Sequence, residues 1–356
     1  MTAPRLEVSL QRIRHNAGSL VDRLGARGIA VTAVTKATLG SPDIARVLLA
    51  AGASAIGDSR IENIEVMRRA GVVAPMVLIR SPMLSQVDRV VEHADVSLNT
   101  ELAVMEGLST AAGALGRVHA VVLMVELGDL REGILPVDVD AVLGQVVRLP
   151  NIVVRGIGTN LACQSGVAPD HRNMAELSAL VRSLEATFDM RLATVSGGNS
   201  ASLDWALGGS GVGRVNDLRL GEAILLGREP LRRRRVDGLH TDAFTLIAEV
   251  IESKVKPTLA WGEVNQTAFG VRARPPDRGD TVRVILALGR QDVDPEGLEA
   301  PAGTTILGAS SDHLILDAGH ALLPVGSEVR FQLSYSALLA AMTSPSVTKV
   351  YLTDSG

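Results

Sequence analysis

The sequence predicts an α/β protein in which a (β/α)8 TIM barrel is followed by a mostly β domain. Up to about residue 230, eight short apolar runs alternate with longer segments whose apolar residues recur at helical spacing. Eight near-continuous apolar strands, each followed by a helix, are typical of a barrel, with an open doubly wound sheet as the alternative. We therefore expect a barrel over residues 1–233 and a β domain over residues 234–356.

The predicted barrel strands share a short length and a high content of Val, Ile, Leu and Ala. They are residues 29–37, 54–58, 75–80, 95–99, 119–127, 153–162, 192–198 and 217–227. Helical spacing is present over 10–24 and 170–188, and Ser41 followed by Pro42 suits an N-cap and a first helical position. Residues 5–9 alternate like a strand and fit either domain.

The second domain shows strand patterns with Gly, Pro and Asp between them, and one helical segment. The strands are residues 243–253, 279–288, 304–309, 313–317 and 328–333, and the helix is 335–342. The basic run 232–235 precedes them. We interpret this run as a solvated linker, with a phosphate or partner patch as the alternative.

Composition excludes several classes of protein. The net charge of -4 argues against a nucleic-acid-binding protein. A single cysteine, Cys163, excludes an internal disulfide framework and a structural zinc site of several thiolates. The first ten residues lack an apolar signal core, and no apolar run reaches the length of a membrane span. We expect a cytoplasmic protein that contacts neither membrane nor nucleic acid and holds no metal.

Lys36 is the first candidate for chemistry, because active sites of barrels lie at the carboxyl ends of the strands. It ends the first strand pattern and is one of only four lysines among 35 basic residues. Such a position suits a Schiff-base lysine, whereas the alternative is a lysine whose ammonium extends into solvent.

A phosphate site is the second expectation. The segment 197–200 (GGNS) lies between the seventh strand and a helical stretch, and Gly221 lies on the eighth strand. Small residues let backbone N–H groups approach an anion, and barrels often bind phosphate after strands 7 and 8. The alternative is a tight turn with Asn199 or Ser200 as an N-cap.

Together these motifs make the chain resemble the fold-type III pyridoxal-phosphate enzymes. It is most similar to the alanine racemase-like amino-acid racemases, and within them to the ornithine racemase branch. The segments that carry the resemblance are 33–37 (AVTKA), 158–163 (GTNLAC), 196–202 (SGGNSAS), 217–227, 288–293 (LGRQDV) and 308–317 (GASSDHLILD). The resemblance implies racemisation of a free amino acid and a homodimer whose active sites are shared between subunits.

The resemblance also implies roles for single residues of the barrel. It implies that Lys36 carries pyridoxal 5'-phosphate and that Arg219 faces the pyridine nitrogen, which favours racemisation over decarboxylation. It implies that Arg131 binds the substrate carboxylate, and we place Asn160 and Cys163 beside the substrate. The residues implied at the phosphate are Asn199, Ser200, Gly221 and Glu222.

Two departures from alanine racemases concern the substrate and the second proton carrier. No tyrosine follows Lys36 closely, and Trp261 stands where those racemases place their catalytic tyrosine. We therefore expect a larger substrate, ornithine or another basic amino acid. Its side-chain ammonium could pair with Asp292, and Asp294 and Asp312 are further acidic candidates.

For the second proton carrier we favour His313, oriented by Asp312, because histidine titrates near neutral pH. Cys163 is the alternative, and Tyr335 and Tyr351 are weaker candidates. Two other activities stay open. One is a non-catalytic carrier of the cofactor, although the single-domain carriers of this fold lack a β domain. The other is a D-amino-acid lyase, although the residues 334–337 lack that branch's metal ligands.

Overall fold

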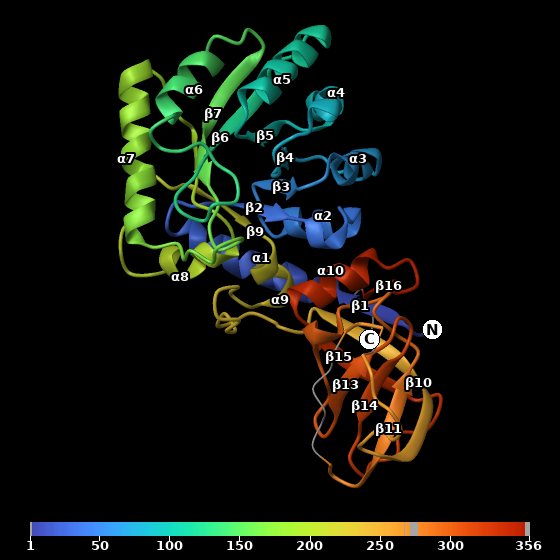
Figure 1. Ribbon diagram of the computed structural model, residues 1–356. Coiled ribbons are helices and arrows are strands. Elements are labelled where there is room, and N and C mark those ends of the chain that lie inside the picture. Colours follow the sequence, from blue (N-terminus) through green and yellow to red (C-terminus); the bar gives the residue numbers. More distant parts are fainter. Residues whose placement is uncertain (1, 267, 271–276, 353–356) are drawn as a thin grey trace. The chain divides into compact units, whose positions relative to one another are not determined.

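A closed barrel of eight parallel strands dominates the larger of two units in the computed structural model (Figure 1). The structure describes residues 2–266, 268–270 and 277–352. One unit is Arg12–Thr241, and the other combines Met1–Gln11 with Asp242–Gly356. The predicted barrel with a separate β domain is confirmed.

The barrel strands follow one another in chain order around the wall, and each pairs in parallel with its neighbours. They are β2 (Ala30–Val34), β3 (Ala55–Asp58), β4 (Met76–Leu78), β5 (Val96–Asn99), β6 (His119–Val125), β7 (Ile152–Thr159), β8 (Thr194–Ser196) and β9 (Asp217–Leu220). Val96, Leu98, Val122 and Met124 form an apolar cluster of buried side chains on β5 and β6. Burial of such clusters supplies most of the driving force for closing the barrel.

Helices lie outside the strands (Figure 1). They are α1 (Leu10–Gly25), α2 (Pro42–Ala50), α3 (Ile61–Arg69), α4 (Val87–His93), α5 (Leu102–Ala114), α6 (Val139–Val146), α7 (His171–Phe188), α8 (Leu203–Ala206) and α9 (Glu222–Leu226). Ser41 accepts the N–H of Ile44 before α2, as the sequence predicts for an N-cap. Asp170 and Asn173 form a reciprocal capping box at α7. None of the helices in the described residues is long and apolar enough to cross a membrane.

Most predicted barrel strands are longer than those of the structure, and at two of them the difference changes the surroundings of a candidate site residue. β2 ends at Val34, and Lys36 opens a 3-10 turn, η1 (Lys36–Thr38). The last barrel strand ends at Leu220, after which Gly221 caps the helix α9. The sequence Glu-Ala-Ile-Leu-Leu consists mainly of good helix formers, so a turn of helix replaces the predicted end of the strand.

The β domain is built around one sheet with the strand order β12-β15-β10-β11-β14-β13. Its elements are β10 (Phe244–Pro257), β11 (Asp280–Leu286), the turn η4 (Pro295–Gly297), β12 (Leu298–Glu299), β13 (Thr305–Ala309), β14 (Leu314–Asp317), β15 (Glu328–Leu333), α10 (Tyr335–Thr343) and β16 (Thr348–Leu352). The strand β1 (Arg5–Ser9) pairs antiparallel with β10 and parallel with β16. Residues from both ends of the chain therefore complete this domain.

The basic run 232–235 is a folded loop of the barrel unit, which corrects its interpretation as a linker. Val236 N–H donates to Gly227 O at 2.9 Å, and Glu229 N–H donates to Arg234 O at 2.9 Å. Residues 228–236 are named the arginine loop below. The cause is Glu229, a buried carboxylate that gathers several backbone N–H groups of the loop.

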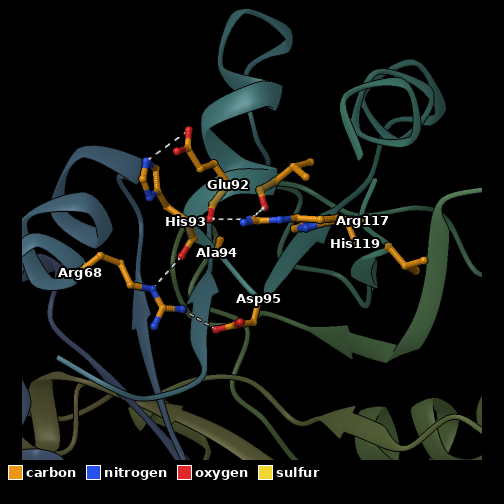
Figure 2. Close-up of a pocket in the computed structure, with 9 residues that line it drawn as sticks. Arg68, Glu92, His93, Ala94, Asp95, Arg117 and His119 are labelled. Atoms are coloured by element: carbon orange, nitrogen blue, oxygen red, sulfur yellow. Dashed lines mark hydrogen bonds and ion pairs between the residues drawn. The ribbon is translucent and has the colours of Figure 1, made fainter. Parts of the chain in front are cut away.

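A cleft of about 530 Å³ opens near the amino ends of β5 and β6 (Figure 2). Lys36 lies at the opposite, carboxyl end of the barrel strands. Arg117 Nη1 donates to Glu92 O at 3.0 Å, and Arg68 Nε donates to His93 O at 3.1 Å. Both guanidinium groups thus satisfy carbonyls at the carboxyl end of α4, which is where cations stabilise a helix. We interpret this cleft as a structural feature of the barrel.

Candidate active site

Lys36 lies in a turn that the neighbouring strand holds in place. Thr38 N–H donates to Thr35 O at 2.9 Å and closes the turn η1. The Thr35 hydroxyl donates to Asp58 Oδ2, at the end of β3, at 2.8 Å. Asp58 is fully buried, and burial raises the pKa of its carboxyl group. These bonds fix the point at which the Lys36 side chain leaves the barrel wall.

Asp58 was not among the residues predicted for the site. It also accepts the N–H of Arg60 at 3.0 Å and the amide of Asn63 at 2.9 Å. It therefore joins the turn of Lys36 to the start of α3. The available signal was an acidic residue at the end of a fully apolar strand, where an ionised group needs partners.

Ser200 and Gly221 lie side by side after β8 and β9. Ser200 is buried, and its Oγ accepts the N–H of Ala223, in the first turn of α9, at 3.2 Å. A Cβ on Gly221 would lie 3.3 Å from the Cβ of Val34, which shows how closely this backbone approaches the end of β2. The start of α9 is thereby packed beside the strand that leads to Lys36.

Arg219 is a buried cation on β9. Its side chain donates to Thr159 O at 2.8 Å and to Asn160 Oδ1 at 3.4 Å, and it also donates to Ser196 Oγ. Burial lowers the pKa of Arg219, while the negative charge of Asp217 acts in the opposite direction. The arginine stays a pure hydrogen-bond donor, held by groups from β7 and β8.

Asn199 and Asn160 meet between the ends of β7 and β8. Asn199 Nδ2 donates to Asn160 Oδ1 at 3.1 Å and to Leu161 O at 2.9 Å, and it lies 3.5 Å from Cys163 Sγ. The Asn199 side chain also accepts the N–H of Ala201 at 2.8 Å. Its side chain is therefore occupied in joining two loops.

Asn160 Nδ2 is buried and has no hydrogen-bond partner among the described residues. An unpaired buried donor costs free energy, so an acceptor is expected at this point. Arg219 lies on the other side of the same amide.

Asp129 organises the loop that follows β7. It is fully buried and accepts the backbone N–H groups of Cys163, Gln164, Ser165 and Val167 at 3.0, 2.9, 3.2 and 3.4 Å. Burial alone would raise the pKa of Asp129, but these bonds outweigh burial and lower it. The sequence analysis gave Asp129 no role, because its partners are backbone groups over thirty residues away.

Arg131 follows Asp129 and pairs with Glu132. Its side chain is 38% exposed, and its positive charge acts on Cys163 and Arg219. The barrel unit thus brings together a set of predicted residues at the carboxyl ends of its strands. They are Lys36, Arg131, Asn160, Cys163, Asn199, Ser200, Arg219, Gly221 and Glu222.

Three predicted residues belong to the other unit. His313 Nδ1 and Asp312 Oδ1 are 2.9 Å apart, and the hydrogen bond lowers the pKa of Asp312. The His313 side chain is 44% exposed. Asp292 accepts the N–H of Gly289 and the hydroxyl of Ser344, both at 3.1 Å, so both of its carboxylate oxygens have partners in its own domain.

Comparisons with known proteins identify the family of the chain. The family described as alanine racemase, N-terminal domain, matches residues 8–229. A lysine racemase from Thermotoga maritima is 37% identical over 353 residues, which cover 99% of each chain. An ornithine racemase from Acetoanaerobium sticklandii is 36% identical over 353 residues, or 98% of this chain and 99% of the relative.

The fold is also found among solved structures. Alanine racemase from D-cycloserine producing Streptomyces lavendulae matches with a TM-score of 0.74 at 20% identity, over 100% of this chain and 99% of the other. A family match over more than half of the chain, with two relatives similar over nearly their whole length, confirms the resemblance inferred from the residues. The chain belongs to the alanine racemase family.

Proposed function

We propose that this protein is a pyridoxal-phosphate-dependent racemase of basic amino acids. The observation that carries the proposal is the convergence of Lys36, Arg219 and the Ser200–Gly221 pair at one end of the barrel. The two relatives named above are a lysine racemase and an ornithine racemase, and both names support a basic substrate.

The residues at this end of the barrel fit the cofactor. Ser200 accepts a hydrogen bond from Ala223, so its hydroxyl proton can go to a phosphate oxygen. The backbone N–H groups of Gly221 and Glu222, at the start of α9, suit the same anion. The unpaired Asn160 Nδ2 supplies a donor beside Arg219 for a polar atom of the cofactor or substrate.

Pyridoxal phosphate, when bound, withdraws electrons from the α-carbon of the amino acid and so weakens its bond to hydrogen. Arg219 can only donate, so it keeps a ring nitrogen placed against it unprotonated. That limits how far negative charge spreads and favours return of a proton over loss of a carboxylate. Lys36 holds the cofactor and then moves the proton on one face of the α-carbon.

Racemisation needs a second proton carrier on the opposite face of the α-carbon. We assign it to His313, with Asp312 holding one ring nitrogen at 2.9 Å. Cys163 is the alternative, because Asp129 fixes its backbone and Asn199 lies beside its sulfur. The test is hydrogen exchange in heavy water: His313→Ala should exchange the α-proton of one enantiomer without interconverting the two. A wild-type rate of racemisation would refute the assignment.

For the substrate we propose that Arg131 binds the carboxylate, with Asn160 and Cys163 nearby. Asp292 is the proposed partner of the side-chain ammonium, although it would have to share its oxygens with Gly289 and Ser344. We further propose a cytoplasmic homodimer in which each site takes residues from both subunits. Mixing Lys36→Ala with His313→Ala protein should then restore part of the activity, and an active monomer in sedimentation would contradict it.

One experiment separates the proposed function from its alternatives. Single enantiomers of ornithine, lysine, arginine and alanine are incubated with protein and pyridoxal phosphate while optical rotation is followed. A racemase brings the rotation of a basic amino acid to zero faster than that of alanine. A new product would indicate a D-amino-acid lyase, an unchanged rotation a carrier protein, and faster racemisation of alanine a different specificity.

A further inference from the structure

The arginine loop has no part in the reaction proposed above, yet its backbone N–H groups converge on one side chain. Glu229 is 3% exposed and accepts the N–H groups of Leu231, Arg232 and Arg234 at 2.8, 3.0 and 3.1 Å. It also pairs with the Arg234 side chain at 3.2 Å. A buried carboxylate with several N–H donors holds a loop in one conformation. The backbone of the arginines in this loop therefore has a defined position.

Arg233 uses that position to reach Glu222. Its Nη1 donates to Glu222 Oε1 at 2.8 Å. Its backbone φ is 58°, a left-handed conformation that costs a residue with a side chain roughly 1–2 kcal/mol. The Arg233 side chain is 59% exposed, whereas that of Glu222 is 14% exposed. The ion pair therefore joins an exposed arginine to a mostly buried carboxylate. The arginine that forms it has a strained backbone conformation.

Lys36 is a second cation that acts on Glu222, since the paired strands β2 and β9 (Ala33 with Leu220) lead to these two residues. Glu222 follows Gly221, and Gly221 packs against Val34, two residues before Lys36. Burial raises the pKa of Glu222, while the positive charges of Arg233 and Lys36 oppose that rise. The other acidic group that acts on it is Glu229, whose oxygens are taken by the arginine loop. The carboxyl group of Glu222 thus lies under the influence of two cations.

We propose that Glu222 is a positioning residue for Lys36: its carboxylate attracts the Lys36 ammonium, and Arg233 holds that carboxylate in place. The inference rests on the proposed function, in which the Lys36 amine alternately holds and releases a proton. A carboxylate nearby stabilises the protonated amine and restrains its direction. The arginine loop thereby influences the reaction although its own arginines lie at the surface.

The first test measures the reactivity of Lys36 in the full-length protein freed of cofactor with hydroxylamine. Acetic anhydride is added at pH 7.5, and acetylation is quantified by peptide mass spectrometry. Because the chain has only four lysines, Lys254, Lys256 and Lys349 serve as internal references. Glu222→Gln should raise the acetylation rate of Lys36 about three- to tenfold relative to them, because less of the amine is protonated. An unchanged rate would overturn the inference.

The matched control uses the second ion pair of the same loop. Asp204 pairs with Arg234 at 2.5 Å, and the two side chains are 53% and 54% exposed. Asp204→Asn should leave both Lys36 acetylation and racemisation unchanged, and an effect as large as that of Glu222→Gln would overturn the inference. Arg233→Ala should also raise the acetylation rate of Lys36, by a smaller factor than Glu222→Gln. Without Arg233, Glu222 loses the positive charge that opposes the rise of its pKa on burial. An opposite effect would overturn the role of Arg233.

The second test is the pH profile of kcat in the holoenzyme, which reports the enzyme–substrate complex in which Lys36 moves the proton. Glu222→Gln should shift the acidic limb of this profile toward lower pH. A merely structural defect would lower the rate without moving the limb. A lower rate with an unmoved limb would therefore overturn the inference. Protection of wild-type Lys36 by pyridoxal phosphate tests the proposed function separately. If the cofactor gives no protection, the proposed function fails. If it protects Lys36 while Glu222→Gln changes neither acetylation nor the pH limb, only the role of Glu222 fails.

Discussion

The buried carboxylate of Asp129, after β6, accepts the backbone N–H of Cys163, after β7, at 3.0 Å. Three more N–H groups of the same loop bind this carboxylate. One side chain therefore determines the position of the loop that carries the protein's only thiol. Residues 163–166 of this loop are exposed, so the position of the loop depends on the negative charge of Asp129.

Asp129→Asn tests this dependence. The amide has one acceptor oxygen instead of two, so we expect a loss of about 2–3 kcal/mol in the free energy of unfolding. Backbone hydrogen exchange at residues 163–167 should rise by at least tenfold, and racemisation should fall. Asp138→Asn, at an exposed residue without a side-chain cap bond, is the control and should change neither. Unchanged exchange in Asp129→Asn would contradict the prediction.

Lys36→Ala should remove both the yellow colour of the bound cofactor and all measurable activity. The reason is that no other lysine lies at the carboxyl end of a barrel strand in the described chain. Absorbance spectra after gel filtration provide the measurement. Lys254→Ala, whose side chain is 65% exposed in the β domain, should keep colour and activity. Retained colour in Lys36→Ala would show that another group holds the cofactor.

Arg219→Lys preserves the charge on β9 but not the planar group that reaches Thr159, Asn160 and Ser196 together. We expect kcat to fall roughly 10- to 100-fold and the free energy of unfolding to fall by about 2 kcal/mol, as acceptors lose their donors. Steady-state kinetics and urea titration measure the two effects. A variant with wild-type kcat would show that the arginine has only a structural role.

Stability should fall in mild acid because of His119. Burial lowers the pKa of this histidine from 6.5 to about 4, and its Nε2 lies 2.8 Å from Ser97 Oγ. The unfolded chain therefore binds a proton near pH 6.5, while the folded chain does so only near pH 4. Between these values, protonation stabilises the unfolded state relative to the folded state. The free energy of unfolding therefore falls by about 2 kcal/mol between pH 7 and pH 5.

Urea titrations at pH 7 and pH 5 measure this loss. His119→Gln should lose less stability between the two pH values than the wild type, since glutamine does not titrate. The exposed His171→Gln is the control and should behave like the wild type. Equal losses in wild type and His119→Gln would place the acid sensitivity elsewhere.

The barrel was predictable because its signals are local. Each strand is a short apolar run, and caps such as Ser41 and Asp170 stand where helices begin. The strand ends were less predictable: the structure places Lys36 in a turn and Glu222 in a helix. The turn of Lys36 depends on the hydrogen bond between Thr35 and Asp58, which joins two strand ends and leaves no mark in the local sequence. The start of α9 packs against Val34, almost 200 positions away in the chain.

The residues that support the site could not be predicted for the same reason. Asp58, Asp129 and Glu229 act by gathering N–H groups, and backbone donors leave no mark in a sequence. The strand β16 was also missed, because it is only five residues long and its partner β1 lies at the other end of the chain. Candidate site residues with a motif of their own, such as Lys36 and Ser200, were easier to propose.

The pairing of β1 has a consequence during synthesis on the ribosome. Residues 5–9 leave the ribosome first, but their two partner strands are residues 244–257 and 348–352. At a translation rate of about 5–20 residues per second, the last partner follows the completed barrel segment by roughly 5–20 s. During that interval β1, which carries the buried Leu6 and Val8, lacks at least one of its two partner strands. Unpaired strand edges are where chaperones bind and where nascent chains aggregate, so the yield of folded protein should respond to translation speed over residues 242–352.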